Sequence, residues 1–116
     1  MLGVTGYNTG TLVEHERWRE FEDIYDSINE KYSPMFDRFP WIITEFASSS
    51  AGGDKAAWID GMFAALPKYP NIKIAVWFNY ADFDITDPYN WQIKRPYWLD
   101  ETPETLRAFK RGVTTN

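Results

Sequence analysis

Three short apolar runs, separated by longer mixed stretches, dominate the pattern of hydrophobic and polar positions along the chain. The runs cover residues 2–5, 41–44 and 72–78, and each predicts a β-strand. The third run is almost continuously apolar, which is typical of a parallel strand that is covered on both faces. The polar and aromatic stretch that follows it, residues 79–100, predicts a long loop.

Between these runs, apolar residues recur every three or four positions, as on the buried face of a helix. A first helix is predicted over about residues 13–32 and a second over 54–66, with Asp54 as its N-cap. The last helix is predicted to begin at Thr102 and Pro103, a capping residue followed by a first-turn proline. The order β-α-β-α-β-α predicts an α/β fold with a parallel sheet and right-handed crossovers.

Three β/α units are too few to close a β/α barrel, which is the architecture that such units commonly form. An eight-stranded β/α barrel takes about 250 residues, so a chain of 116 residues could supply fewer than half of one. The chain also opens directly on a predicted strand at Met1, as though it began inside a larger fold. We therefore expect residues 1–116 to form three units of an incomplete (β/α)8 TIM barrel.

The charge and composition of the chain argue against several classes of binding partner and site. A formal net charge of −5 argues against nucleic acid and anionic membranes, which need a basic patch. No apolar run approaches the roughly 20 residues that span a bilayer, and no signal peptide is recognised at the start. The chain has no cysteine, which excludes disulfides, zinc–thiolate sites and thiol nucleophiles.

Aromatic residues make up 18% of the chain, including six Trp, which is more than a core of this size requires. Some of them are expected to line a cleft, where flat rings meet the apolar faces of sugars or of other rings.

The residues expected at the ends of the strands suggest a chemistry. Strand ends in a β/α fold converge on one mouth, and here they would deliver Tyr7 and Asn8, then Glu45, then Trp77 and Asn79. A carboxylate, a phenol that can hydrogen-bond it and a large flat ring suit glycoside hydrolysis. From the residues alone this pattern is not specific to glycoside hydrolysis, because the strands of any barrel can carry such side chains.

Several segments resemble the C-terminal part of the catalytic barrel of glycoside hydrolase family 26, which contains β-mannanases, β-glucanases and β-xylanases. Residues 43–48 and 52–59 resemble its seventh β/α unit. Residues 71–79, with Asn90-Trp91, resemble its eighth unit, and Gly6-Tyr7-Asn8 resembles the end of its sixth strand. The resemblance extends over nearly the whole chain.

The resemblance implies a retaining, endo-acting hydrolase of β-linked polysaccharide, mannan or glucan, from a secreted parent enzyme, with no cofactor or metal. Glu45 matches the nucleophile, Tyr7 the residue that orients it, and Trp77 the floor of the sugar site. Asn8, Asn79 and Trp91 would line the substrate site.

The general acid/base of that family lies on its fourth strand, which has no counterpart here. Retaining hydrolysis requires two carboxyl groups about 5–5.5 Å apart. Asn29-Glu30 imitates an acid/base pair but lies within the predicted first helix. The isolated chain is therefore expected to be inactive.

Two other classes of function stay open: a carbohydrate-binding module without catalysis, and a partial barrel that closes by self-assembly. Open strand edges predict a homo-oligomer or pairing with a missing N-terminal part of the barrel. Asp82, Asp84 and Asp87 lack the spacing of a calcium loop and are interpreted as a polar loop.

Overall fold

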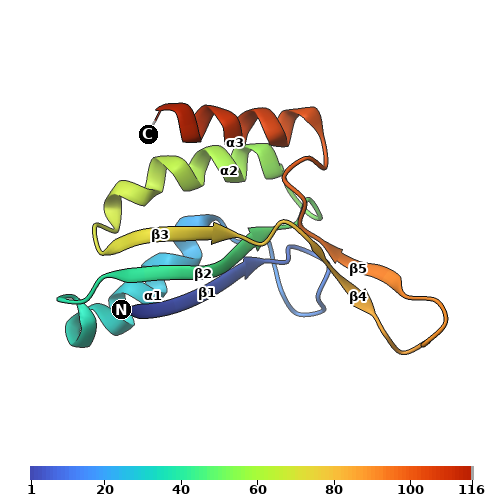
Figure 1. The fold of residues 1–116 in the computed structure, drawn as a ribbon, viewed down its shortest axis with the longest axis horizontal. Coiled ribbons are helices and arrows are strands. Elements are labelled where there is room, and N and C mark those ends of the chain that lie inside the picture. Colours follow the sequence, from blue (N-terminus) through green and yellow to red (C-terminus); the bar gives the residue numbers. More distant parts are fainter. Residues whose placement is uncertain (116) are drawn as a thin grey trace.

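The computed structural model describes residues 1–115, which form two small sheets and three α-helices. Strands β1, β2 and β3 make a parallel sheet in that order, and β4 and β5 make a separate antiparallel hairpin (Figure 1). In chain order the elements are β1 Leu2–Asn8, α1 Phe21–Phe36, β2 Trp41–Ser48, α2 Lys55–Ala65, the 3₁₀ turn η1 Leu66–Lys68, β3 Ile72–Trp77, β4 Ala81–Asp84, β5 Gln92–Pro96 and α3 Pro103–Thr115.

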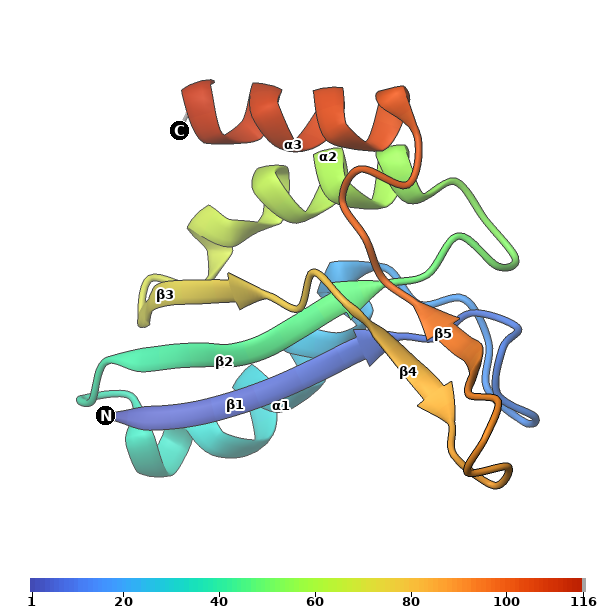
Figure 2. The same cartoon turned by 45° about the vertical axis from the view of Figure 1, so that its right-hand side comes forward.

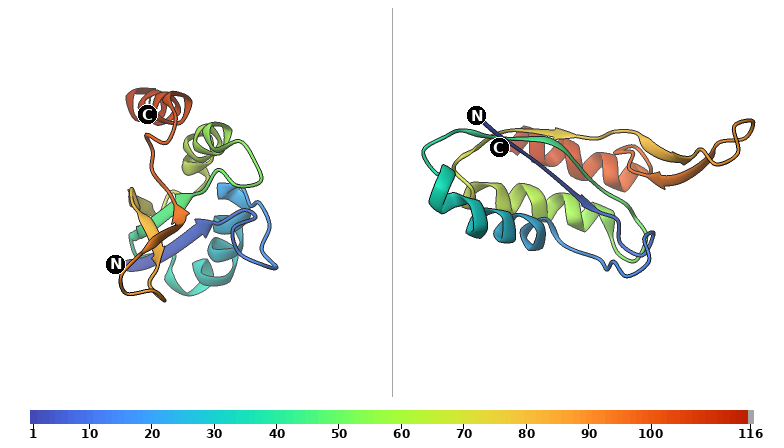
Figure 3. Two further views of the ribbon diagram at one scale, coloured as in Figure 1. Left: turned by 90° about the vertical axis from the view of Figure 1, so that its right-hand side faces the viewer. Right: turned by 90° about the horizontal axis from the view of Figure 1, so that it is seen from below.

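The helices lie on one side of the parallel sheet, where α1 and α2 pack and α3 covers α2 (Figure 3). The core between these layers contains Phe21 and Tyr25 of α1, Phe46 of β2 and Trp58 of α2, each at most 3% exposed. No helix among residues 1–115 is long and apolar enough to cross a membrane.

Helix α3 approaches α2 closely because glycine occupies the point of contact. A Cβ atom on Gly112 would lie 1.9 Å from the ring of Phe63, so a larger residue would force the two helices apart. The same close packing buries Ala108 of α3 completely, whereas Val113 is 57% exposed.

No described helix packs on the other face of the parallel sheet, which the hairpin and Tyr97 cover only at the pocket end. On β3, Ile74 and Val76 are each 47% exposed. The prediction that this strand is covered on both faces is therefore wrong, because the described helices pack on one side only.

The prediction that residues 1–116 form the last three units of a (β/α)8 barrel is also wrong. The chain leaves β3 into an antiparallel hairpin, in the stretch that was predicted to be a loop, and reaches α3 only afterwards. The backbone N–H of Tyr97 bonds the Tyr80 carbonyl at 2.9 Å and closes the base of that hairpin. The fold is a small α/β domain that combines parallel and antiparallel pairing.

Helix boundaries follow local capping chemistry. Helix α1 begins at Phe21, later than predicted, because Glu20 and Asp23 form a capping box at that point. It continues through Pro34 to Phe36, past its predicted end at about residue 32. The predicted start of α2 is confirmed, since the Asp54 carboxylate accepts a hydrogen bond from the Ala57 N–H at 3.1 Å.

Candidate functional site

Glu45 lies inside strand β2, three residues before its end, and a β-bulge sets the direction of its side chain. Val4 pairs with Ile43 and Thr5 pairs with Glu45, so Thr44 is an extra residue on β2. A bulge of this kind changes which face the following side chains point to. Ile43 is fully buried against the helices, whereas Glu45 is exposed on the open face.

Tyr7 shares that face with Glu45. Paired residues of neighbouring strands project to the same side, and residues two apart along one strand do so as well. Since Glu45 pairs with Thr5, and Tyr7 follows Thr5 by two positions, the two side chains are diagonal neighbours. Both line a pocket of about 380 Å³.

The pocket lies where the C-terminal ends of the parallel strands meet the hairpin. Strands β1 and β2, the loop after β1, the hairpin and the residue following β5 all contribute side chains, and Figure 2 shows the hairpin beside the end of β1. The lining residues are Tyr7, Thr9, Glu16, Arg19, Glu45, Asp82, Arg95 and Tyr97.

Two of the three carboxylates in this pocket are already engaged. Asp82 accepts a hydrogen bond from Arg95 Nε at 2.8 Å within an ion pair. Glu16 accepts a hydrogen bond from the Thr9 hydroxyl. The Glu45 carboxylate forms no hydrogen bond or ion pair with any residue in the described part of the chain, so it is the one that is open to a ligand.

Tyr97 supplies a protonated phenol to the pocket. The residue is only 2% exposed, and its ring centroid lies 5.2 Å from that of Tyr7. Burial raises the pKa of Tyr97 to about 12, although the positive charge of Arg95 opposes the shift. Like any tyrosine, this side chain is protonated at neutral pH, and its phenol can donate a hydrogen bond to a hydroxyl bound in the pocket.

Trp77 lies outside the pocket, on the side of the sheet that the helices cover. Its indole N–H bonds the Tyr97 carbonyl at 2.8 Å, and its ring packs edge-on against Phe46 and Trp58. The predicted role as the floor of a sugar site stays a prediction, and the placement favours a packing role.

The remaining predicted residues also lie apart from Glu45. Asn8 is fully buried: its amide donates to Ser48 Oγ at 3.0 Å and accepts from the Arg19 N–H at 2.8 Å. Asn79 accepts from the Leu99 N–H at 2.7 Å. Trp91, in the turn of the hairpin, is 59% exposed. Of the six predicted residues, the structure brings only Glu45 and Tyr7 together in this pocket.

Sequence reasoning missed the residues that the loop after β1 and the hairpin bring in. Asp82 was noted only as part of a polar loop, and Arg19, Arg95 and Tyr97 drew no attention. Alternation of apolar and polar residues over residues 81–84 is a signal for a strand, but residues 92–96 show no such alternation, so the sequence did not reveal the hairpin. Among the described residues, no group of three His, Asp or Glu side chains could hold a metal ion.

No protein-family profile matches the chain. The chain is 30% identical over 113 residues to Endoglucanase H of Acetivibrio thermocellus. The matched region covers 95% of this chain and 11% of that protein. The chain is thus distantly similar to one segment of an endoglucanase, and membership of glycoside hydrolase family 26 stays a prediction.

Proposed function

We propose that the pocket around Glu45 binds a β-linked glycan, and that Glu45 serves as the carboxylate nucleophile of a retaining, endo-acting β-glycan hydrolase. The observation that carries this proposal is the bulge at Thr44, which directs an unpaired carboxylate into a pocket beside two tyrosines. The similarity to a segment of an endoglucanase supports a β-glucan as the first substrate to test.

In the proposed reaction a Glu45 oxygen attacks the anomeric carbon and forms a glycosyl ester as the glycosidic C–O bond breaks. Tyr7, the diagonal neighbour of Glu45, would orient the carboxylate through its hydroxyl once the sugar is bound. The buried phenol of Tyr97 would hold a sugar hydroxyl. Water then hydrolyses the ester and regenerates the carboxylate.

The leaving oxygen needs a proton, and the pocket offers no free second carboxyl group to supply it. Asp82 is held by Arg95, and Glu16 is hydrogen-bonded by Thr9. Loss of general acid catalysis costs about 10²–10⁴-fold in rate. We therefore expect the 116-residue chain to bind glycan but to release no measurable reducing sugar from β-glucan or β-mannan.

A substrate whose leaving group departs without being protonated tests Glu45 as the nucleophile even though the chain lacks a general acid. A fluorinated β-glucoside with a dinitrophenyl leaving group expels a stable phenolate without protonation, and the fluorine slows hydrolysis of the resulting ester. Incubation followed by mass spectrometry of the digested protein should locate one added glycosyl group on Glu45. The Glu45→Gln variant should stay unlabelled because an amide cannot form the ester.

Glu16→Gln is the matched control, because it alters another pocket carboxylate that has no assigned role in bond formation. It should be labelled as the wild type is. Labelling of the Glu45→Gln variant, or absence of label on Glu45 in wild-type protein that binds the glucoside, would refute the nucleophile assignment. The second of these results would favour a carbohydrate-binding domain without catalysis.

A further inference from the structure

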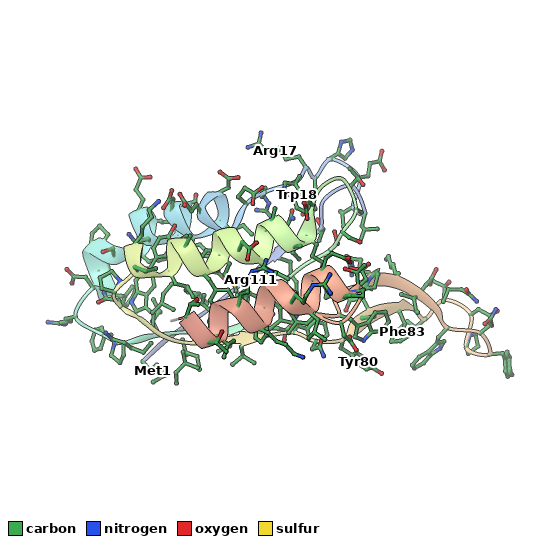
Figure 4. All side chains as sticks on the ribbon, turned by 90° about the horizontal axis from the view of Figure 1, so that it is seen from above. Met1, Arg17, Trp18, Tyr80, Phe83 and Arg111 are labelled. Carbon is green, nitrogen blue, oxygen red and sulfur yellow. The ribbon has the colours of Figure 1, made fainter. Side chains whose placement is uncertain are left out.

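Five aromatic rings form a row that begins in the Glu45 pocket, where Tyr97, Tyr7 and Phe78 contact one another, and continues onto the hairpin. Successive ring centroids lie 5.2, 6.1, 6.3 and 5.8 Å apart. Figure 4 shows Tyr80 and Phe83, the last two rings, near the base of the hairpin. In order, the row is Tyr97, Tyr7, Phe78, Tyr80 and Phe83.

Exposure increases along this row from Tyr97 to Tyr80. Tyr97 is buried, Tyr7 and Phe78 are partly buried, and Tyr80 is 56% exposed. Phe83, partly buried, stands beside Tyr80. Tyr97 and Tyr7 thus belong to the wall of the pocket, whereas Tyr80 offers its ring to solvent. An aromatic side chain that is left open beside a pocket loses the stabilisation it would gain from burial, unless a ligand covers it.

We propose that this row extends the Glu45 pocket into a binding surface for further sugar units of one linear β-linked glycan. The inference rests on the proposed function, because the inner end of the row lies in the Glu45 pocket. Neighbouring rings are tilted by 42–88° and do not form one flat platform. A sugar unit beyond the pocket could therefore lay its apolar C–H face on the exposed ring of Tyr80, with Phe83 beside it, while its hydroxyls stay hydrated.

Polar groups beside the row suit a sugar chain better than an apolar partner. The Asp82–Arg95 ion pair flanks the row where it enters the hairpin, and the tyrosine hydroxyls add hydrogen-bonding groups. A glycan can bond these groups at the edges of its rings. An apolar protein surface would have to desolvate them, which costs free energy unless each finds a partner.

Chain length of the ligand is the decisive variable for the test. Isothermal titration calorimetry with a β-glucan trisaccharide and a hexasaccharide should show tighter binding of the hexasaccharide by the wild-type protein. Tyr80→Ala and Phe83→Ala should each weaken binding of the hexasaccharide about tenfold and leave binding of the trisaccharide unchanged. A tenfold loss corresponds to about 1.4 kcal/mol of binding free energy.

Tyr89→Ala is the matched control, since Tyr89 is 96% exposed on the same hairpin and has no ring contact in the row. It should bind both oligosaccharides as the wild type does, and circular dichroism should show all variants folded. Equal wild-type affinity for the two oligosaccharides would refute the extended surface alone, as would unchanged hexasaccharide binding by Tyr80→Ala. Absence of binding by either oligosaccharide would refute the glycan pocket and this extension together.

Discussion

Replacing Glu101 by Ala tests how much the ion pair between Lys55 and Glu101 contributes to the stability of the fold. This pair joins the start of α2 to the segment that leads from the pocket into α3. Lys55, at the start of α2, is 2% exposed, and its ammonium donates to Glu101 Oε2 at 2.9 Å and to the Trp98 carbonyl at 2.6 Å. Glu101 also accepts from Ser50 Oγ at 2.7 Å. The substitution removes the only carboxylate that these contacts give to a buried ammonium.

The expected loss can be estimated from the burial of the two partners. Removing one member of a buried ion pair costs about 3–5 kcal/mol, because the other charge is left uncompensated. The Lys55 side chain is 1% exposed but that of Glu101 is 25% exposed, so water can partly replace the carboxylate. We therefore expect Glu101→Ala to lower the free energy of unfolding by about 3 kcal/mol, at the lower end of that range.

Urea unfolding followed by tryptophan fluorescence measures this loss, and Asp60→Ala is the matched control. Asp60 pairs with Arg111 across α2 and α3, but both side chains are at least 50% exposed. Such a surface pair contributes under about 1 kcal/mol. Equal losses for the two variants would refute the reasoning, since the difference rests entirely on burial.

The pH dependence supplies an independent check on the same ion pair. Burial lowers the pKa of Lys55, and Glu101 counteracts that shift. In Glu101→Ala the unfolded chain should therefore bind more protons than the folded one below the ordinary lysine pKa of 10.5. Stability rises with pH wherever the unfolded state binds more protons. The deficit of the variant should accordingly shrink as the pH rises toward that value.

Two further predictions concern aromatic residues of the site. Trp77→Ala should lower the free energy of unfolding by about 3–5 kcal/mol in urea melts, because the ring packs in the core. The control Trp91→Ala should change it by under about 0.5 kcal/mol. A Trp77→Ala protein that stays stable but loses glycan affinity would instead support a role of Trp77 as the floor of the sugar site. The pKa of Tyr97 is raised from 10.0 to about 12 in the fold, so this side chain stabilises the folded state fully below pH 10 and loses that contribution as the pH approaches 12. Ultraviolet absorbance should show the late formation of tyrosinate. Tyr97→Phe should remove one of the late-ionising tyrosines, since burial also raises the pKa of Tyr25 and of Tyr69. Ionisation of all tyrosines near pH 10.0 would contradict the burial.

Local features of the sequence were sufficient to predict most of the regular elements. Asp54 and Pro103 mark the starts of α2 and α3 through capping and first-turn chemistry that acts within one helical turn. The apolar runs located all three parallel strands, because each run is short, β-branched and bounded by turn residues. Glu45 and Tyr7 could be paired as candidates because they follow neighbouring strands of the predicted sheet.

Only the tertiary structure decided how these elements become a fold and a pocket. The face that Glu45 occupies depends on Thr44 being left out of the pairing with β1, and that register is set some 40 residues away along the chain. The hairpin pairs residues 81–84 with 92–96 and carries Asp82, Arg95 and Tyr97 to Glu45, a juxtaposition that no local pattern encodes. The exposure of one face of β3 likewise follows from where the helices pack. The sequence of an apolar strand does not show whether one of its faces is buried or both. Sequence thus determined the elements through interactions within a few residues, and long-range pairing determined the site.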